Sequence, residues 1–259
     1  MLSRSLCLLA GLLPAGSALA VELAPHRGVY DLSLAEHTLG LTGVEGRIAI
    51  DLSAPSCEAY DLDYRFVARF GEEDEVTLTD QRILASEGRD GTSYDFTATS
   101  LVDGIEQSRV EGSARTREDQ TRVEMRQPVE RTFEIPAALF PLGHTRRIIE
   151  RARAGERIVQ GPLYDGDVEG DDVLTTTAII TPLQGNAERP DGIEGLNGWR
   201  VDESYYNSSS DADGLPTFHT RYTLFENGVT DDLYIDFGDY ALEGSLSELT
   251  LGEGPTDCG

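Results

Sequence analysis

Apolar and polar side chains alternate one by one along most of this chain. The clearest segment spans residues 215–251, where three consecutive runs carry apolar side chains on one side: Phe218, Tyr222 and Leu224; Leu233, Ile235 and Phe237; Tyr240, Leu242 and Leu246. Asn227 and Gly228 separate the first two runs, and this dipeptide favours positive φ values at both positions of a tight hairpin turn. The segment predicts an antiparallel meander with one apolar and one solvated face.

The same pattern recurs in short units through the rest of the chain. Further runs are found at residues 30–34, 44–52, 60–70, 75–84, 93–102, 105–115, 121–126, 157–164, 172–181 and from 199 onward. Turn-forming segments separate them, including residues 86–91 and the pair Asp103–Gly104. The spacing is that of consecutive hairpins and predicts roughly fourteen strands.

One segment follows helical spacing instead. After Pro141, the positions Leu142, Thr145, Ile148, Ile149 and Ala152 recur every three or four residues, and Gly155 stands where a helix would end. We therefore predict one helix. A closed barrel of roughly fourteen strands would leave an interior too wide for side chains to fill, so we expect an open or spiral sheet partly plugged by this helix, in a single domain over residues 21–259.

The N-terminal twenty residues have the features of a cleaved export signal. Arg4 precedes an apolar run from Leu6 to Leu13, and Ala18-Leu19-Ala20 fits the small-x-small pattern of signal peptidase sites. A membrane anchor is the alternative, but the run is far shorter than the roughly 20 apolar residues that span a bilayer. We expect cleavage after Ala20 and no transmembrane segment in the mature chain.

Export affects the interpretation of the cysteines. Cys7 would leave with the signal, so that Cys57 and Cys258 remain as an even pair in an oxidising compartment. We predict a disulfide between them; two free thiols are the alternative.

The charge of the chain excludes one class of partner. It contains 47 acidic and 21 basic residues, for a net charge of −26, and every basic residue is an arginine. Nucleic acids are bound through basic surfaces, which this composition does not supply. Anionic lipid head groups are poor partners for the same reason.

No catalytic motif is present. The four histidines show no H-E-x-x-H spacing, and no G-x-S-x-G sequence provides a nucleophile elbow: His26, His37, His144 and His219. The glycine-rich segment 185–198 lacks the lysine and the following helix of a phosphate-binding loop. We therefore expect no catalytic residues, no cofactor and no enzymatic activity.

An acidic turn at residues 165–172 resembles the first half of a calcium-binding loop. Asp165, Asp167, Glu169 and Gly170 fit that pattern, but Thr176 occupies the position of the bidentate carboxylate. A solvated hairpin turn explains the segment better, and we predict no tight metal site, although weak divalent binding stays open.

Two surfaces remain as candidates for binding. One face of the predicted helix concentrates positive charge, and either lies in solvent or contacts an acidic partner: Arg146, Arg147, Arg151 and Arg153. The apolar faces of the strands carry many aromatic residues, which either close a core or line a cavity for an acyl chain: Tyr64, Phe66, Phe70, Phe96, Phe218, Tyr222 and Phe237.

Six phrases, in order from residue 24 to residue 233, resemble a known family: APHRGVYDLSL (24–34), LTGVEGR (41–47), CEAY (57–60), LTDQ (78–81), LYDG (163–166) and FENGVTDDL (225–233). The chain resembles the EipB family of periplasmic cell-envelope integrity proteins, over nearly all of residues 24–258. The resemblance implies a β-spiral with a helix packed at its opening, and a disulfide at Cys57 and Cys258. It also implies a non-enzymatic role in the envelope, with periplasmic protein partners that include helical-repeat proteins.

The sequence thus favours a non-enzymatic periplasmic protein that supports the envelope by binding or scaffolding. The alternative is a carrier or sensor of lipid or lipoprotein acyl chains, held at the concave face of the sheet. This alternative draws on the aromatic face and on a general similarity in shape to lipoprotein carriers.

Overall fold

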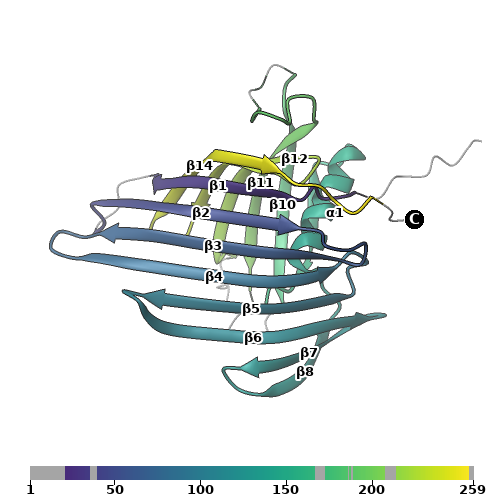
Figure 1. Ribbon diagram of the computed structural model, residues 1–259, viewed down its shortest axis with the longest axis horizontal. Helices are drawn as coiled ribbons and strands as arrows, with labels where there is room; N and C mark the ends of the chain where they lie inside the picture. The colour runs from purple at the N-terminus through teal and green to yellow at the C-terminus, as the bar shows by residue number, and fades with distance from the viewer. Residues whose placement is uncertain are drawn as a thin grey trace, which may run out of the picture.

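A computed structural model describes residues 21–35, 40–166, 173–185, 187, 189–207 and 214–256. This part of the chain forms fourteen strands and one helix (Figure 1). In chain order they are β1 (His26–Leu34), β2 (Gly43–Ser53), β3 (Ala59–Gly71), β4 (Val76–Gly88), β5 (Ser93–Val102), β6 (Ile105–Arg117), β7 (Gln120–Gln127), β8 (Arg131–Pro136), α1 (Pro141–Arg153), β9 (Ile158–Leu163), β10 (Leu174–Pro182), β11 (Gly198–Tyr206), β12 (Phe218–Phe225), β13 (Thr230–Asp236) and β14 (Ala241–Leu251). The predicted mainly-β class, with roughly fourteen strands and one helix, is confirmed.

All fourteen strands belong to one antiparallel sheet, in the order β8-β7-β6-β5-β4-β3-β2-β1-β14-β13-β12-β11-β10-β9. Two meanders, β1–β8 and β9–β14, are therefore joined where β1 pairs with β14. The edge strands β8 and β9 do not pair with each other, so the sheet curls without closing. The segment after β8 reaches the other edge, where Leu139 N–H donates to Pro162 O at 3.0 Å and Tyr164 N–H to Leu139 O at 2.9 Å.

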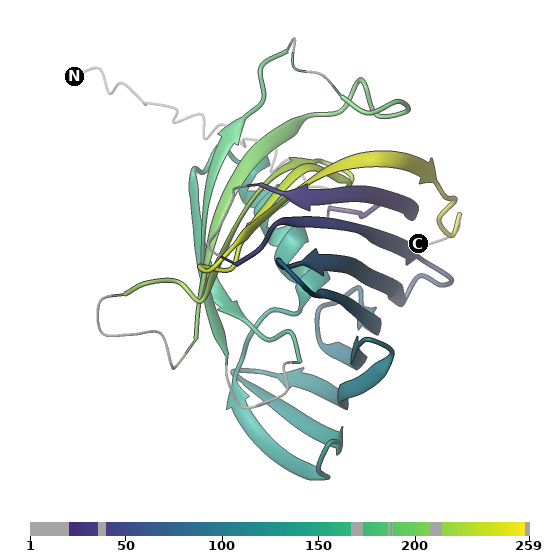
Figure 2. The ribbon, with the colours of Figure 1, turned by 90° about the vertical axis from the view of Figure 1, so that its left-hand side faces the viewer.

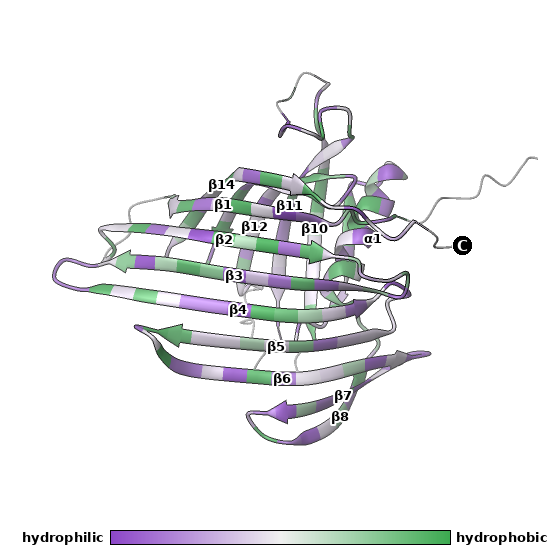
Figure 3. Ribbon diagram, in the orientation of Figure 1, coloured by the Kyte–Doolittle hydropathy of each residue, from purple (hydrophilic) through white to green (hydrophobic). Residues whose placement is uncertain are grey.

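The alternating pattern gives each strand one apolar face. The sheet curls so that these faces turn inward and are buried. In β7, for example, Thr121, Val123 and Met125 are buried while the residues between them are exposed. Figure 3 shows the same alternation of hydrophobic and hydrophilic residues along the strands. Burial of one continuous apolar face fixes the register, since a slip of one residue would turn that face to solvent.

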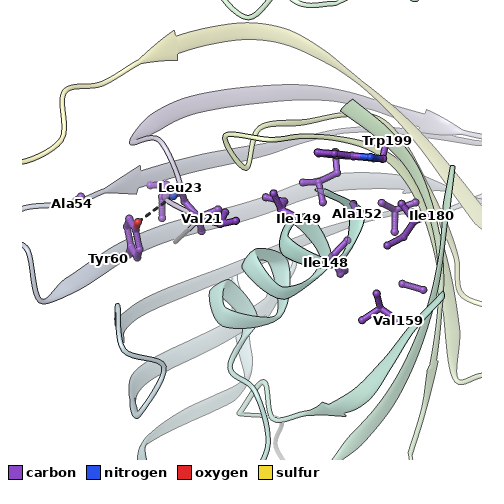
Figure 4. Packing of buried hydrophobic residues seen from close by; sticks show 14 residues of the cluster. Val21, Leu23, Ala54, Tyr60, Ile148, Ile149, Ala152, Val159, Ile180 and Trp199 are labelled. Atoms are coloured by element: carbon purple, nitrogen blue, oxygen red, sulfur yellow. Dashed lines mark hydrogen bonds between the residues drawn. The ribbon is translucent and has the colours of Figure 1, made fainter. Parts of the chain in front are cut away.

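The helix α1 lies within the curve of the sheet (Figure 2). It begins at Pro141 and ends before Gly155, whose φ of +82° suits a glycine. Its inward face carries Ile148, Ile149 and Ala152, which pack with residues of the N-terminus and of both meanders in one hydrophobic cluster: Val21, Leu23, Leu52, Ala54, Tyr60, Val159, Ala178, Ile180, Trp199, Val201 and Leu224. Figure 4 shows this packing. The helix thus fills much of the space inside the sheet, as predicted.

Of two hairpin turns predicted from the sequence, one has the expected φ values and the other does not. Asp103 and Gly104 have φ values of +51° and +78°, as expected of a two-residue hairpin. At Asn227–Gly228 only Gly228 has a positive φ, of +91°. Gly228 N–H donates to Phe225 O, and Phe225 N–H to Val229 O, each at 2.9 Å. The loop is therefore a longer turn closed by a left-handed glycine, and the predicted pair of positive φ values is wrong.

Two element boundaries also differ from the prediction. The segment 86–91 was expected to be a turn, but β4 continues to Gly88 and buries Glu87. The short strand β8 does not stand out in the sequence because Pro128 lies shortly before it and Pro136 is its last residue. Cys57 is disulfide-bonded; Cys258 lies outside the described residues, so its pairing with Cys57 stays a prediction.

Candidate functional site

The concave face of the sheet holds an apolar pocket beside the start of α1. Its volume is about 320 Å³. The wall is formed mainly by aliphatic side chains of the N-terminal segment, β2, β3, β12 and β13, and by the first residues of the helix: Leu23, Ile50, Leu52, Leu62, Leu224, Leu233, Ile235, Pro141 and Leu142. The other residues that border it are mainly tyrosines and threonines: Tyr64, Tyr205, Tyr222, Tyr234, Thr145, Thr220, Thr230, His26, Arg221 and Gly228. We define these residues as the concave pocket.

A buried carboxylate holds the helix at the edge of the concave pocket. Phe140, at the N-cap of α1, provides no side-chain acceptor. Glu87 of β4 takes that role: Leu142 N–H donates to its Oε2 at 2.8 Å and Gly143 N–H to its Oε1 at 2.6 Å. The positive end of the helix dipole favours a carboxylate here. Burial nevertheless outweighs these bonds and the nearby Arg146, and raises the pKa of Glu87 to about 7.

A second buried carboxylate holds the same helix from the opposite wall. Glu203 of β11 is fully buried, and its Oε1 lies 2.5 Å from His144 Nε2. The Tyr222 hydroxyl donates to Glu203 Oε2 at 2.9 Å, and Tyr205 also bonds to this carboxylate. Burial raises the pKa of both tyrosines well above the ordinary value, with the Glu203 carboxylate as a further cause. Glu87 and Glu203 together fix α1 between the two meanders.

The N-terminal segment closes another side of the concave pocket. Leu23 N–H donates to the Tyr60 hydroxyl at 3.1 Å, and that hydroxyl donates to Glu22 Oε2 at 2.8 Å. Arg89 also donates to Glu22 Oε2, at 2.6 Å, and its guanidinium lies 4.4 Å from the centre of the Tyr60 ring. These bonds hold Leu23 in place, where its side chain borders the pocket and packs with α1.

The seven aromatic residues named from the sequence do not form one lining. Tyr64 and Tyr222 border the concave pocket. The other five lie elsewhere: Phe66 is buried in a neighbouring cluster, Phe70 packs edge-on against Tyr240, Phe96 stacks on Tyr94, Phe218 stacks on Tyr205, and Phe237 is 42% exposed. The sheet is long enough that its inner face carries several separate clusters.

The four arginines named on α1 do not form a uniform basic surface. Arg146 turns inward and donates to the backbone oxygen of Arg89. Arg151 pairs with Glu156 at 2.6 Å, and Arg153 lies 3.7 Å from Glu226. Arg147 alone of the four has no hydrogen bond or ion pair with the described residues. Three of the four arginines are thus already paired with a carboxylate or a backbone carbonyl of the same chain.

The remaining candidates show no metal or catalytic geometry. Within the described residues, no group of three or more metal-ligating side chains comes together. His26 bonds to Ala24 O at 2.8 Å, and burial lowers its pKa; His219 lies 2.8 Å from Asp202. His37 and most of the acidic turn, residues 167–172, lie outside the described residues.

Sequence reasoning missed Glu87, Glu203 and Leu23. Glu203 could have been found, because two-residue alternation places it on the same face as Val201 and Trp199. Glu87 lies in a Ser-Glu-Gly-Arg-Asp-Gly stretch that is typical of a turn, so its inward position depends on the helix it meets. No local pattern marks Leu23.

Comparison with known proteins establishes the family. A protein-family model described as EipB-like matches residues 17–253. The chain belongs to the EipB-like family. It is 31% identical to the cell envelope integrity protein EipB of Brucella abortus (strain 2308) over 254 residues, which cover 94% of this chain and 91% of that protein.

Solved structures include one with the same fold. It is the crystal structure of a beta-barrel-like protein of a domain of unknown function (DUF1849) from Brucella abortus, with a TM-score of 0.86, 29% sequence identity, and coverage of 90% of this chain and 100% of that one. The resemblance to the EipB family is thereby confirmed. No helix within the described ranges is long and apolar enough to cross a membrane.

Proposed function

We propose that this EipB-like chain is an exported periplasmic protein that supports the cell envelope by binding, without catalysis. The name of its Brucella relative supports the envelope role. The observation that carries the binding mechanism is the concave pocket, an apolar hollow of about 320 Å³ whose position is fixed by two buried carboxylates. Small-molecule sites are hollows of this kind, largely preformed and mostly apolar.

A more specific form of this function is favoured by the lining of the pocket. Nine of its lining residues are aliphatic residues or proline, seven carry a hydroxyl group, and the remaining three are His26, Arg221 and Gly228. Such a lining suits a single acyl chain, since each buried methylene contributes about 0.8 kcal/mol. The volume is near the lower end of ligand pockets, about 300–1,000 Å³, and fits one chain better than a two-chain lipid. We propose a carrier or sensor of lipid or lipoprotein acyl chains.

Complementation with a blocked pocket tests this function. Ile50→Trp places a larger side chain in the concave pocket, whereas Ile179→Trp makes the same change at an outer position that is 51% exposed. In a strain lacking the gene, we expect the Ile179→Trp protein to restore resistance to detergent and the Ile50→Trp protein to fail at equal periplasmic abundance. Equal rescue by both proteins would show that the pocket is not the working site.

A further inference from the structure

The distribution of charged residues around the concave pocket narrows the class of ligand that the pocket can bind. Acidic residues make up 47 of the 259 residues, and four other surface hollows each include at least one: Asp51, Asp31, Asp80 and Glu253, respectively. Among the described residues, no Asp or Glu borders the concave pocket. The described part of the chain therefore keeps carboxylates out of this hollow.

Within the described ranges, no positive side chain is directed into the concave pocket either. Arg221 and Tyr234 border it, but Leu233 and Ile235 pack in the inner cluster, so Tyr234 between them faces outward. Arg221 is paired with Tyr234 across the strands and stacks on its ring at 4.2 Å, beside an outer hollow that both residues also border. The side chains of Arg221 and Tyr234 thus lie together on the outer face of the sheet. His26 is buried, and its lowered pKa favours the neutral ring.

A charged head group would find no compensation inside this pocket. Moving a carboxylate or phosphate out of water costs several kcal/mol unless a partner of opposite charge is present. The buried Glu203 carboxylate lies directly behind Tyr222 and would repel a second negative charge. The strongly negative net charge of the chain acts in the same direction.

One hydroxyl group of the pocket nevertheless has no partner among the described residues. Tyr64 forms no hydrogen bond with them, and desolvation raises the pKa of its hydroxyl. The other pocket hydroxyls are satisfied on the inner face: Tyr222 by Glu203, Tyr205 by Glu203 and Thr220, Thr230 by the Tyr30 hydroxyl at 2.9 Å, and Thr145 by Pro141 O at 3.1 Å. A ligand acceptor would give the Tyr64 hydroxyl the hydrogen bond that these residues do not supply.

We propose that the concave pocket binds one acyl chain in uncharged form, as an ester or amide, and that the Tyr64 hydroxyl donates to its carbonyl oxygen. Free fatty acid carboxylates and phosphate-headed amphiphiles are rejected. This inference rests on the proposed function and adds the chemical class of the ligand. It selects acyl groups attached to glycerol or to a protein amine over the ionised products of their hydrolysis.

Displacement of a neutral fluorescent probe, N-phenyl-1-naphthylamine, tests the inference on the purified mature chain at pH 8. We expect methyl decanoate to displace the probe at concentrations at least tenfold lower than sodium decanoate or decyl phosphate. Tyr64→Phe should weaken methyl decanoate about three- to tenfold without changing direct binding of the probe, which has no carbonyl. Tyr234→Phe, on the outer face, is the matched control.

The possible failures are distinguishable. If decanoate competes as well as its methyl ester, or if Tyr64→Phe does not change the affinity for the ester relative to the probe, the proposed ligand class is overturned while the pocket remains a binding site. If neither the probe nor any acyl compound binds the wild-type chain, or if Ile50→Trp binds them equally, the proposed binding function itself fails.

Discussion

Replacing Glu87 with glutamine tests whether a buried carboxylate holds the helix beside the pocket. Glu87 is 2% exposed and accepts the N–H groups of Leu142 and Gly143, with a pKa of about 7 against the ordinary 4.5. As the pH rises from 4.5 to 7, this carboxyl ionises in the unfolded chain and stays largely protonated in the folded one. The folded state then binds more protons, so its stability falls with rising pH.

The size of this effect follows from the two pKa values. A difference of about 2.5 pKa units corresponds to about 3 kcal/mol once the pH exceeds both values, and most of it, about 2.5 kcal/mol, develops between pH 5 and pH 8. Glu87→Gln removes the titration and keeps one acceptor. The free energy of unfolding of the Glu87→Gln protein should be lower by about 1–2 kcal/mol at every pH, because one of the two hydrogen bonds from the helix is lost. It should also decline less than that of the wild type between pH 5 and pH 8.

Urea unfolding followed by the fluorescence of Trp199, the one tryptophan of the sequence, supplies the free energies at each pH. All other ionisable groups are common to both proteins, so their contributions cancel in the difference. Glu106→Gln, which removes a carboxylate from an exposed position of β6, should retain the wild-type profile. A difference between wild type and Glu87→Gln that stays constant within about 0.5 kcal/mol from pH 5 to pH 8 would refute this explanation.

Three further substitutions test the packing around the helix and the sheet. Ile148→Ala should lower the free energy of unfolding by about 2–5 kcal/mol because its side chain is fully buried, whereas Ile158→Ala, at a 61% exposed position, should cost under about 1 kcal/mol. Gly46→Ala should cost about 1–3 kcal/mol, since its Cβ would lie 2.7 Å from the neighbouring strand, and Gly43→Ala, with open space, should stay within about 0.5 kcal/mol. Tyr222→Phe removes a hydrogen bond to the buried glutamate of β11 and should cost about 1.5–3 kcal/mol. Urea unfolding curves measure the free energy of unfolding for all of these proteins. The packing described would be contradicted by equal losses of stability for the buried and the exposed isoleucine, by equal losses for the two glycines, or by no loss for Tyr222→Phe.

The strands could be predicted because the sheet buries one face of each, which leaves a two-residue pattern in the sequence. The helix could be predicted from its spacing between Pro141 and Gly155. The ends of the strands were less predictable: at Glu87 the local residues favour a turn, yet β4 continues because its carboxylate bonds to the helix. A contact between residues 55 positions apart leaves no local signal.

The pocket itself could be predicted only in part. Phe237 follows the end of β13 and lies at 42% exposure against the ring of Tyr240. Which of the aromatic residues share a cavity depends on how the sheet curls and on where α1 lies. Tyr64 and Tyr222, far apart in the sequence, border one pocket because β3 and β12 belong to facing walls of the curled sheet.

Native mass spectrometry of the protein isolated under mild conditions from its own periplasm tests the central claim most directly. We expect the wild-type protein to carry one uncharged acyl-bearing molecule, and the Ile50→Trp protein, prepared in the same way, to be empty. A wild-type protein that is persistently empty, or the same bound molecule in both proteins, would contradict the claim that the concave pocket is a binding site.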